Sequence, residues 1–195
     1  MMQMDDAMKA ISSHRGDAIV IASQSSRVPW MQASTRQDLD VPFAGAMSKE
    51  SSVALGIALA RPDTKIIVLS GDGELLMNLG TLVTIASQSP ANLYHFVLDN
   101  RVYATTGGQP VPGAGSASLV GMAQAASYPA TYEFYEAGGL SRSIKGLLDL
   151  KGPVFVCLHV EAQIRQRPSG QRQRPWKPLR EYLHSLREML ARKTG

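Results

Sequence analysis

The amino-acid sequence predicts an α/β fold: a doubly wound, mostly parallel sheet with helices on both faces, followed by a basic C-terminal helical tail. Two observations support this prediction. Short apolar runs of strand length alternate with helical segments along residues 1–161, a pattern typical of parallel sheets. Residues 162–195 differ in composition, because they hold 9 Lys and Arg against 2 Asp and Glu. We therefore expect a domain at 1–161 and a tail at 162–195.

The expected elements alternate regularly between helix and strand. Apolar runs such as DAIVIAS, KIIVLSGDG and LYHFVLDN are bounded by turn residues and read as buried strands. We expect helices at 4–14, 48–60, 74–87, 119–126 and 141–150. We expect strands at 17–23, 65–73, 93–100, 131–136 and 153–161, and a long loop at 101–117.

Composition excludes several classes of protein. The apolar fraction of 44% and the charged fraction of 18% are ordinary for a soluble globular domain. The longest apolar runs, at 18–22 and 154–158, are far too short to span a membrane. Residues 1–11 do not resemble a signal peptide, so we expect a cytoplasmic protein. The single cysteine, Cys157, cannot build a disulfide or an iron–sulfur site and reads as a buried, inert thiol.

The net charge of +4 comes from the tail, since residues 1–161 hold 11 Lys and Arg against 14 Asp and Glu. The tail begins with an extended, Pro-containing segment. A helix with leucines on one face follows, at positions 179, 183, 186 and 190. No aromatic-interleaved basic platform accompanies this charge, so the sequence does not favour nucleic-acid binding. We expect the tail to dock onto another subunit.

Two strand ends carry the most informative residues. Gly71, Asp72 and Gly73 close one predicted strand, and Asn100 closes the next, 28 positions after Asp72. A carboxylate and an amide oxygen are hard ligands of the kind Mg²⁺ takes, and they leave coordination positions for phosphate oxygens. These positions also lie at the carboxyl ends of strands, where such sheets bind ligands. The pattern predicts a site for a cation that carries a diphosphate.

The backbone around Asp72 also suits a diphosphate. Gly71 and Gly73 let the chain approach the phosphates closely. The amides of Gly73, Glu74 and Leu75 open the following helix, whose N-terminal dipole favours an anion. A carboxylate beside a diphosphate would repel it, so we expect the Glu74 side chain to point away while its amide contributes.

The string GDGELLMNLGTLVTIA…FVLDNRVYATTGGQP resembles the diphosphate-binding domain of thiamine diphosphate (ThDP) enzymes. It looks most like sulfopyruvate decarboxylase beta subunits and phosphonopyruvate decarboxylases, over about residues 41–160. The resemblance implies bound ThDP and Mg²⁺, with the backbone carbonyl of Val102 as a third metal ligand. It also implies that the Gly45 carbonyl bonds the exocyclic amine of ThDP and that Met47 props the cofactor into a bent shape.

The loop after Asn100 is similar to the family's loop at the reaction centre. It follows the metal ligand directly, so it can close over the diphosphate and face the substrate. By resemblance the cofactor contacts include Tyr103, Ala104 and Thr105. The candidate substrate contacts are Thr106, Gly107, Gly108 and Gln109.

The resemblance also implies a partner. In this family a glutamate on a separate pyrimidine-binding domain activates the cofactor, and no candidate for it is found here. We therefore expect the chain to be the diphosphate-binding, beta-type subunit of a heteromeric ThDP- and Mg-dependent 2-oxoacid decarboxylase. An alpha-type subunit would complete the active site in an α2β2 or larger assembly. The isolated chain would be inactive, and the substrate would be a small 2-oxoacid such as sulfopyruvate or phosphonopyruvate.

Three alternatives remain open at this point. The chain could be the beta subunit of a 2-oxoacid:ferredoxin oxidoreductase, although those subunits commonly carry several cysteines. It could belong to a ThDP-dependent carboligase or lyase, or be a non-catalytic scaffold subunit.

Other polar residues read as ordinary structure. We expect His95 and His159 to be satisfied core histidines, Glu50 to be a surface or first-turn carboxylate, and Arg27 to be a solvated loop charge that could reach an anionic substrate.

Overall fold

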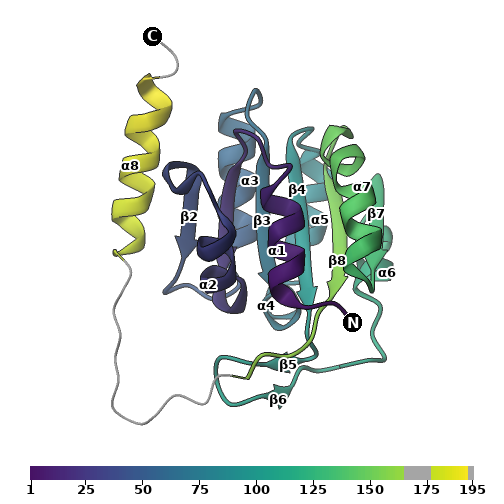
Figure 1. Ribbon diagram of the computed structural model, residues 1–195. Helices are drawn as coiled ribbons and strands as arrows, with labels where there is room; N and C mark the ends of the chain where they lie inside the picture. Colours follow the sequence, from purple (N-terminus) through teal and green to yellow (C-terminus); the bar gives the residue numbers. More distant parts are fainter. Residues whose placement is uncertain (165–176, 193–195) are drawn as a thin grey trace.

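The computed structural model describes residues 1–164 and 177–192 (Figure 1). Its centre is one sheet of six parallel strands, in the spatial order β2-β1-β3-β4-β8-β7. The strands are β2 (Asp40–Phe43), β1 (Ile19–Ser23), β3 (Ile66–Gly71), β4 (Leu93–Asp99), β8 (Val154–His159) and β7 (Ala130–Phe134). The predicted doubly wound parallel sheet is confirmed.

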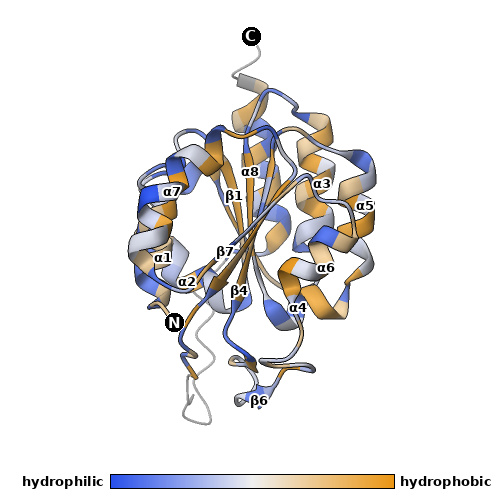
Figure 2. Ribbon diagram, turned by 90° about the vertical axis from the view of Figure 1, so that its right-hand side faces the viewer, coloured by the Kyte–Doolittle hydropathy of each residue, from blue (hydrophilic) through white to orange (hydrophobic). Residues whose placement is uncertain are grey.

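Helices cover both faces of the sheet, and each face has its own apolar core (Figure 2). One layer holds α1 (Met4–Ser12), α2 (Gln24–Ala33) and α7 (Ala137–Asp149). The other holds α3 (Glu50–Ala60), α4 (Asp72–Met77), α5 (Gly80–Gln88) and α6 (Leu119–Ala125). Strands buried on both sides need apolar residues at successive positions, which explains the continuous apolar runs in β1, β3 and β8.

The order of the strands creates a crevice between β1 and β3. From β1 the chain crosses through α2 to the edge strand β2, and then returns through α3 to β3 on the other side of β1. Because these crossings use helices on opposite faces, the carboxyl ends of β1 and β3 lie at a topological switch point. Ligands of open α/β sheets bind at such points.

The structure differs from the predicted elements in three places. The helix expected at 74–87 is two helices, because Asn78 leaves the helical region and its side-chain amide donates to Ser48 O at 3.0 Å. The helix α2 and the short strand β2 were not predicted. The expected loop at 101–117 contains a small antiparallel pair, β5 (Val102–Tyr103) and β6 (Gln109–Pro110).

The C-terminal helix α8 (Leu179–Arg192) confirms the predicted tail helix. The helix lies beside β2 (Figure 1). Its apolar face packs against the core, where Leu186 is buried. We expected the tail to dock onto another subunit, but here α8 covers an edge strand of its own chain, which shields that edge from pairing. The extended segment predicted before it falls at 165–176, outside the described residues.

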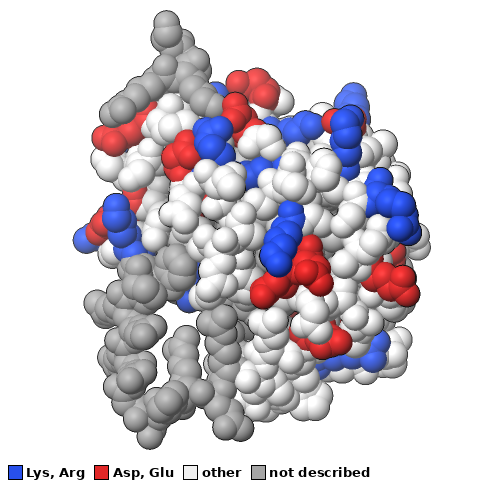
Figure 3. Space-filling model, in the orientation of Figure 1, with Lys and Arg blue, Asp and Glu red and all other residues white. Residues whose placement is uncertain are grey.

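The described surface carries charges of both signs. Lys and Arg side chains are interspersed with Asp and Glu over the face that Figure 3 shows. Among the described helices, none is both long and apolar enough to cross a membrane.

A buried ion pair ties the start of β1 to the edge strand. Arg15 Nη1 lies 2.5 Å from Asp40 Oδ1, with both side chains almost fully buried. The same guanidinium donates to the carbonyls of Ala18, Leu39 and Arg36. Burial lowers the pKa of Arg15, while Asp40 acts in the opposite direction. A buried charge of this kind is tolerated only while its partners remain in place.

We therefore predict that Arg15→Ala will lower the free energy of unfolding by about 3–5 kcal/mol, because it leaves the Asp40 carboxylate buried without its partner. Urea denaturation measures the change. The matched control is Arg36→Ala, which removes an exposed arginine paired with Asp17 and Asp38 and should have a much smaller effect. Equal losses in the two variants would contradict the structural role assigned to Arg15.

Candidate cofactor-binding site

The two strand ends singled out in the sequence are neighbours in the sheet. β3 and β4 pair in parallel with Gly71 opposite Leu98, so the residues that follow them emerge side by side. Asp72 is buried, and its two carboxylate oxygens accept the backbone N–H groups of Gly73 at 2.8 Å and Arg101 at 2.7 Å. Through Asp72 the end of β3 is bonded directly to the segment that follows β4.

Asn100 is held beside Asp72 in a similar way. Its side chain is buried, and its Oδ1 accepts the N–H of Val102 at 3.0 Å. The carbonyl of Val102 accepts the N–H of Ala104 at 3.0 Å. Each of these oxygens keeps a second lone pair. Residues Asp72, Asn100 and Val102, the three predicted ligands, line one cleft.

The electrostatics at Asp72 favour a cation. The pKa of the Asp72 carboxyl is raised to about 7, mainly by burial and also by the neighbouring Asp99, while the two backbone N–H groups act in the opposite direction. A buried carboxylate beside a second carboxylate is stabilised by a positive ion. Because the donors are oxygens from one carboxylate, one amide and one carbonyl, they fit a hard ion such as Mg²⁺.

Gly73 lies against an aromatic ring that leaves no room for a side chain unless the ring moves. A Cβ atom built there would lie 2.3 Å from the ring of Tyr103. The aromatic ring thus packs directly against the backbone of the Gly-Asp-Gly turn. This contact places the predicted loop residue Tyr103 at the site and explains the second glycine of the motif.

The side chain of Glu74 turns back toward Gly71 and Ser23. This is the orientation expected from the sequence, in which the carboxylate points away from the phosphates. Its Oε2 accepts the N–H of Gly71 at 2.9 Å and the hydroxyl of Ser23 at 2.6 Å. The bond to Gly71 is half of a capping box and fixes the start of α4. The pKa of Glu74 is raised to about 8, mainly by burial and also by the charge of the nearby Glu50. At neutral pH a neutral Glu74 does not repel an anion above it.

Glu50 corrects one expectation. It lies in the first turn of α3, as expected, but its side chain is buried and not at the surface. Burial raises its pKa, and it lies within reach of Ser70 and Glu74. Ser70 in turn lies 3.2 Å from Nε2 of His95, a fully buried histidine whose pKa burial lowers to about 4. A polar layer therefore supports the turn from within the core.

A narrow cleft joins most of the predicted cofactor contacts. It is lined by Gln24, Ser25, Met47, Gly71, Asp72, Gly73, Glu74, Asn100, Val102, Tyr103, Ala104 and Thr105. Gln24 and Ser25, at the end of β1, were not predicted. No pattern in the sequence singles them out, because polar residues after a strand are typical of any turn. Gln24 has a positive φ of 41°, which marks the sharp start of α2.

Some predicted contacts lie elsewhere. Gly45 is exposed and has a φ of 91°, a turn conformation that favours glycine. The Leu75 side chain belongs to the apolar core, so only its backbone faces the turn. Gly107 and Gln109 are exposed, and Gly108 between them is half-buried.

A second cavity of about 360 Å³ adjoins the cleft and shares several of its residues. It is lined by Met4, Gln24, Ser25, Arg27, Val28, Asn100, Ala104, Thr105, Thr106 and Gln163. Its volume lies in the range of small-molecule sites. Arg27, expected to be a solvated charge, is half-buried and lines this cavity beside the cofactor cleft.

Comparison with known sequences identifies the family. The profile of the thiamine pyrophosphate enzyme, C-terminal TPP binding domain, matches residues 21–157. The chain belongs to this family. The predicted resemblance is confirmed, and the Gly-Asp-Gly turn at the end of β3 lies inside the matched segment.

Two curated relatives are decarboxylases. The phosphonopyruvate decarboxylase of Streptomyces viridochromogenes is 36% identical over 148 residues, which is 74% of this chain and 36% of the relative. The sulfopyruvate decarboxylase subunit beta of Methanothermobacter thermautotrophicus is 57% identical over 65 residues, which is 33% of this chain and 35% of the relative. The chain therefore spans only about a third of each of these relatives.

Solved structures share the fold at low identity. The thiamine diphosphate-dependent 4-hydroxybenzoylformate decarboxylase of Rhodococcus jostii aligns with a TM-score of 0.70 and 18% identity, covering 84% of this chain and 33% of that chain. The benzoylformate decarboxylase of Polynucleobacter necessarius gives 0.68 and 18%, with 84% and 34% covered. These likenesses confirm the fold.

Glu74 leads to a prediction about pH. Its folded-state pKa of about 8 lies above its ordinary value of 4.5, so the stability it contributes is fully present below about pH 4.5 and is lost as the pH rises through 8. The Glu74→Gln variant removes this titration. We predict that its free energy of unfolding will fall less between pH 4.5 and 8, by up to about 1.4 kcal/mol per pH unit relative to the wild type.

Urea denaturation at a series of pH values measures both slopes. The matched control is Glu136→Gln, which changes an exposed glutamate before α7 and should keep the wild-type slope. A Glu74→Gln variant with the full wild-type slope would show that the Glu74 carboxyl is charged in the folded protein.

Proposed function

We propose that this chain is the diphosphate-binding part of a ThDP- and Mg²⁺-dependent 2-oxoacid decarboxylase. The observation that supports it most directly is the pair Asp72 and Asn100, buried side by side at the ends of β3 and β4. The switch point beside them and the matched family profile point to the same ligand. In this proposal Asp72, Asn100 and the Val102 carbonyl hold the metal.

When bound, the cofactor would supply a carbon nucleophile for the keto carbon of the substrate and a ring that accepts the electrons released on decarboxylation. The chain's own residues bind and orient. Gly73 lets the backbone approach the phosphates, and the amides that open α4 face them. Met47 lines the same cleft and is placed to support the cofactor's central part. Tyr103, packed on Gly73, borders the cleft.

We propose that a separate alpha-type subunit completes the active site. Support comes from the sulfopyruvate decarboxylase relatives, three of which are named subunit beta. In that arrangement the cofactor would lie between the subunits, the partner would supply the activating glutamate, and this chain alone would be inactive. In this proposal residues 1–161 form the cofactor-binding domain, and residues 162–195 are a C-terminal extension of it.

We propose a small 2-oxoacid with a second anionic group as substrate, of the sulfopyruvate or phosphonopyruvate type. The names of the relatives support this class. The cavity beside the cleft does so independently, because it carries Arg27 together with the hydroxyls of Ser25, Thr105 and Thr106. An arginine is well suited to bind a carboxylate, sulfonate or phosphonate.

A carboligase is the second candidate. It rests on a 37% identity over 65 residues to the acetolactate synthase isozyme 1 large subunit of Escherichia coli, of which the match covers 11%. The same cleft would serve either reaction, and analysis of the products separates them, since a carboligase joins the decarboxylated unit to a second carbonyl compound.

The metal ligand gives the main test. We predict tight, Mg²⁺-dependent binding of ThDP to the chain co-purified with its alpha-type partner, measured by calorimetry. In Asp72→Asn the affinity should fall by more than about 100-fold, because losing even a residue that only orients a ligand costs 10–100-fold.

The matched control is Asp63→Asn. Asp63 is an exposed aspartate that pairs with Arg61. It precedes β3 and so lies at the amino-terminal ends of the strands, away from the cleft. This variant should bind ThDP as the wild type does. If the wild-type complex did not bind ThDP, or if Asp72→Asn bound it equally well, the proposed function would be wrong.

A further inference from the structure

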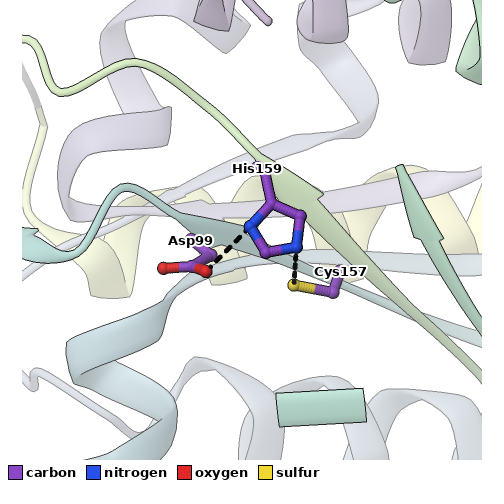
Figure 4. Close-up of side chains that lie close together, drawn as sticks. All are labelled: Asp99, Cys157 and His159. Atoms are coloured by element: carbon purple, nitrogen blue, oxygen red, sulfur yellow. Dashed lines mark hydrogen bonds and ion pairs between the residues drawn. The ribbon is translucent and has the colours of Figure 1, made fainter. Parts of the chain in front are cut away.

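A second group of potential metal ligands lies at the carboxyl edge of the sheet, one strand away from the cofactor cleft. The parallel register places Asp99 of β4 beside His159 of β8, and Glu133 of β7 beside Cys157 of β8. Cys157 and His159 are two positions apart, so their side chains point to the same face of the sheet. Figure 4 shows Asp99 and Cys157 approaching the two sides of the His159 ring.

The distances within this group are short. His159 Nδ1 lies 2.9 Å from Asp99 Oδ2, and Cys157 Sγ lies 3.9 Å from His159 Nε2. One oxygen, one sulfur and one nitrogen from the three residues all lie within 4.8 Å of one another. Cys157 and His159 are buried, and Asp99 is partly buried. His159 is buried in the core, as expected, and each of its ring nitrogens faces a carboxylate, Nδ1 that of Asp99 and Nε2 that of Glu133.

Glu133 faces one ring nitrogen of the histidine. Its Oε1 lies 2.7 Å from His159 Nε2, and a carboxylate only accepts hydrogen bonds, so Nε2 carries the proton. In the neutral ring, Nδ1 then presents a lone pair. Nδ1 is buried and has no hydrogen-bond partner among the described residues, although Asp99 Oδ2 faces it at 2.9 Å. A lone pair facing a carboxylate is repulsive, and either a proton on Nδ1 or a metal cation between the two atoms removes that repulsion.

We propose that Asp99, Cys157 and His159 form a binding site for a borderline-soft divalent cation such as Zn²⁺. Zinc takes thiolate, imidazole and carboxylate ligands together, at about 2.3, 2.0–2.1 and 2.0–2.2 Å. Tetrahedral geometry then requires the ligand atoms to be roughly 3.3–3.6 Å apart, so the observed 2.9 Å needs only a small expansion. The Cys157 thiol must turn toward Nδ1. Three protein ligands leave the fourth position for water.

Glu133 is the positioning residue of this site. By fixing the proton on Nε2 it directs Nδ1 to the cation, as carboxylates commonly do for metal-bound histidines. Tyr135 adds to this, because its ring stacks on His159 with centroids 4.0 Å apart and planes 8° apart. The imidazole is thus held on two sides before any cation arrives.

The donor set separates this site from the cofactor cleft. Mg²⁺ selects oxygen ligands, whereas a thiolate and an imidazole favour softer ions. Burial and the surrounding carboxylates raise the pKa of the Cys157 thiol. A bound cation must therefore displace the thiol proton, and its charge would offset the same carboxylates.

Cobalt gives a direct test, because Cys157 is the single cysteine of the chain. The reduced full-length protein is titrated with Co²⁺ and its absorption spectrum recorded. We predict a thiolate-to-cobalt charge-transfer band in the near ultraviolet, which only Cys157 can produce. Zn²⁺ should abolish the band by displacing Co²⁺, and excess Mg²⁺ should leave it unchanged.

Variants assign the ligands. The band should be lost in Cys157→Ser and should persist in Asp72→Asn, where the cleft is impaired. Glu133→Gln should weaken Co²⁺ binding by about 10–100-fold, whereas Glu136→Gln, a nearby exposed change, should not. A wild-type protein without the band at millimolar Co²⁺ would overturn the proposal, even if Cys157→Ser failed to fold. Unchanged affinity in His159→Gln would overturn it too.

Discussion

The parallel pairing of β3, β4 and β8 is the constraint on which the rest of the structure depends. With Gly71 opposite Leu98 and Asp99 opposite His159, three strands end at one edge in fixed register. Parallel strands bring only carboxyl ends to that edge, so the residues that follow each strand meet there regardless of their distance in sequence. A shift of one residue would turn each of these side chains to the other face.

Three buried carboxylic acid side chains lie near the carboxyl ends of these strands. Asp72, Glu74 and Glu50 are each buried, and burial raises the pKa of all three. Keeping several charged carboxylates in a low-dielectric interior would cost more free energy than a domain of this size can spare. The structure avoids that cost in two ways. Glu74 and Glu50 lie together where neutral forms are favoured, whereas Asp72 faces the cleft, where a cation can neutralise it.

Much of the fold was predictable because its signals are local. The runs KIIVLSGDG and LYHFVLDN each hold apolar residues at successive positions, as is typical of strands buried on both faces. The helix α2 was missed because QSSRVPWM has no helical periodicity and contains Pro29. The break before α5 depends on the bond from Asn78 to Ser48 O, a contact between segments 30 residues apart. Tertiary contacts of this kind leave no pattern in a single sequence.

The site shows the same limit. Asp72 and Asn100 were predictable because each directly ends a recognisable strand, and neighbouring strands of a parallel sheet share one edge. The group around His159 was not, because β8 inserts between β4 and β7, and the strand order alone brings its residues together. Asp99 belongs to both settings, since it faces His159 at 2.9 Å and its charge raises the pKa of Asp72. One carboxylate therefore couples the electrostatics of the cofactor cleft to those of the neighbouring cluster.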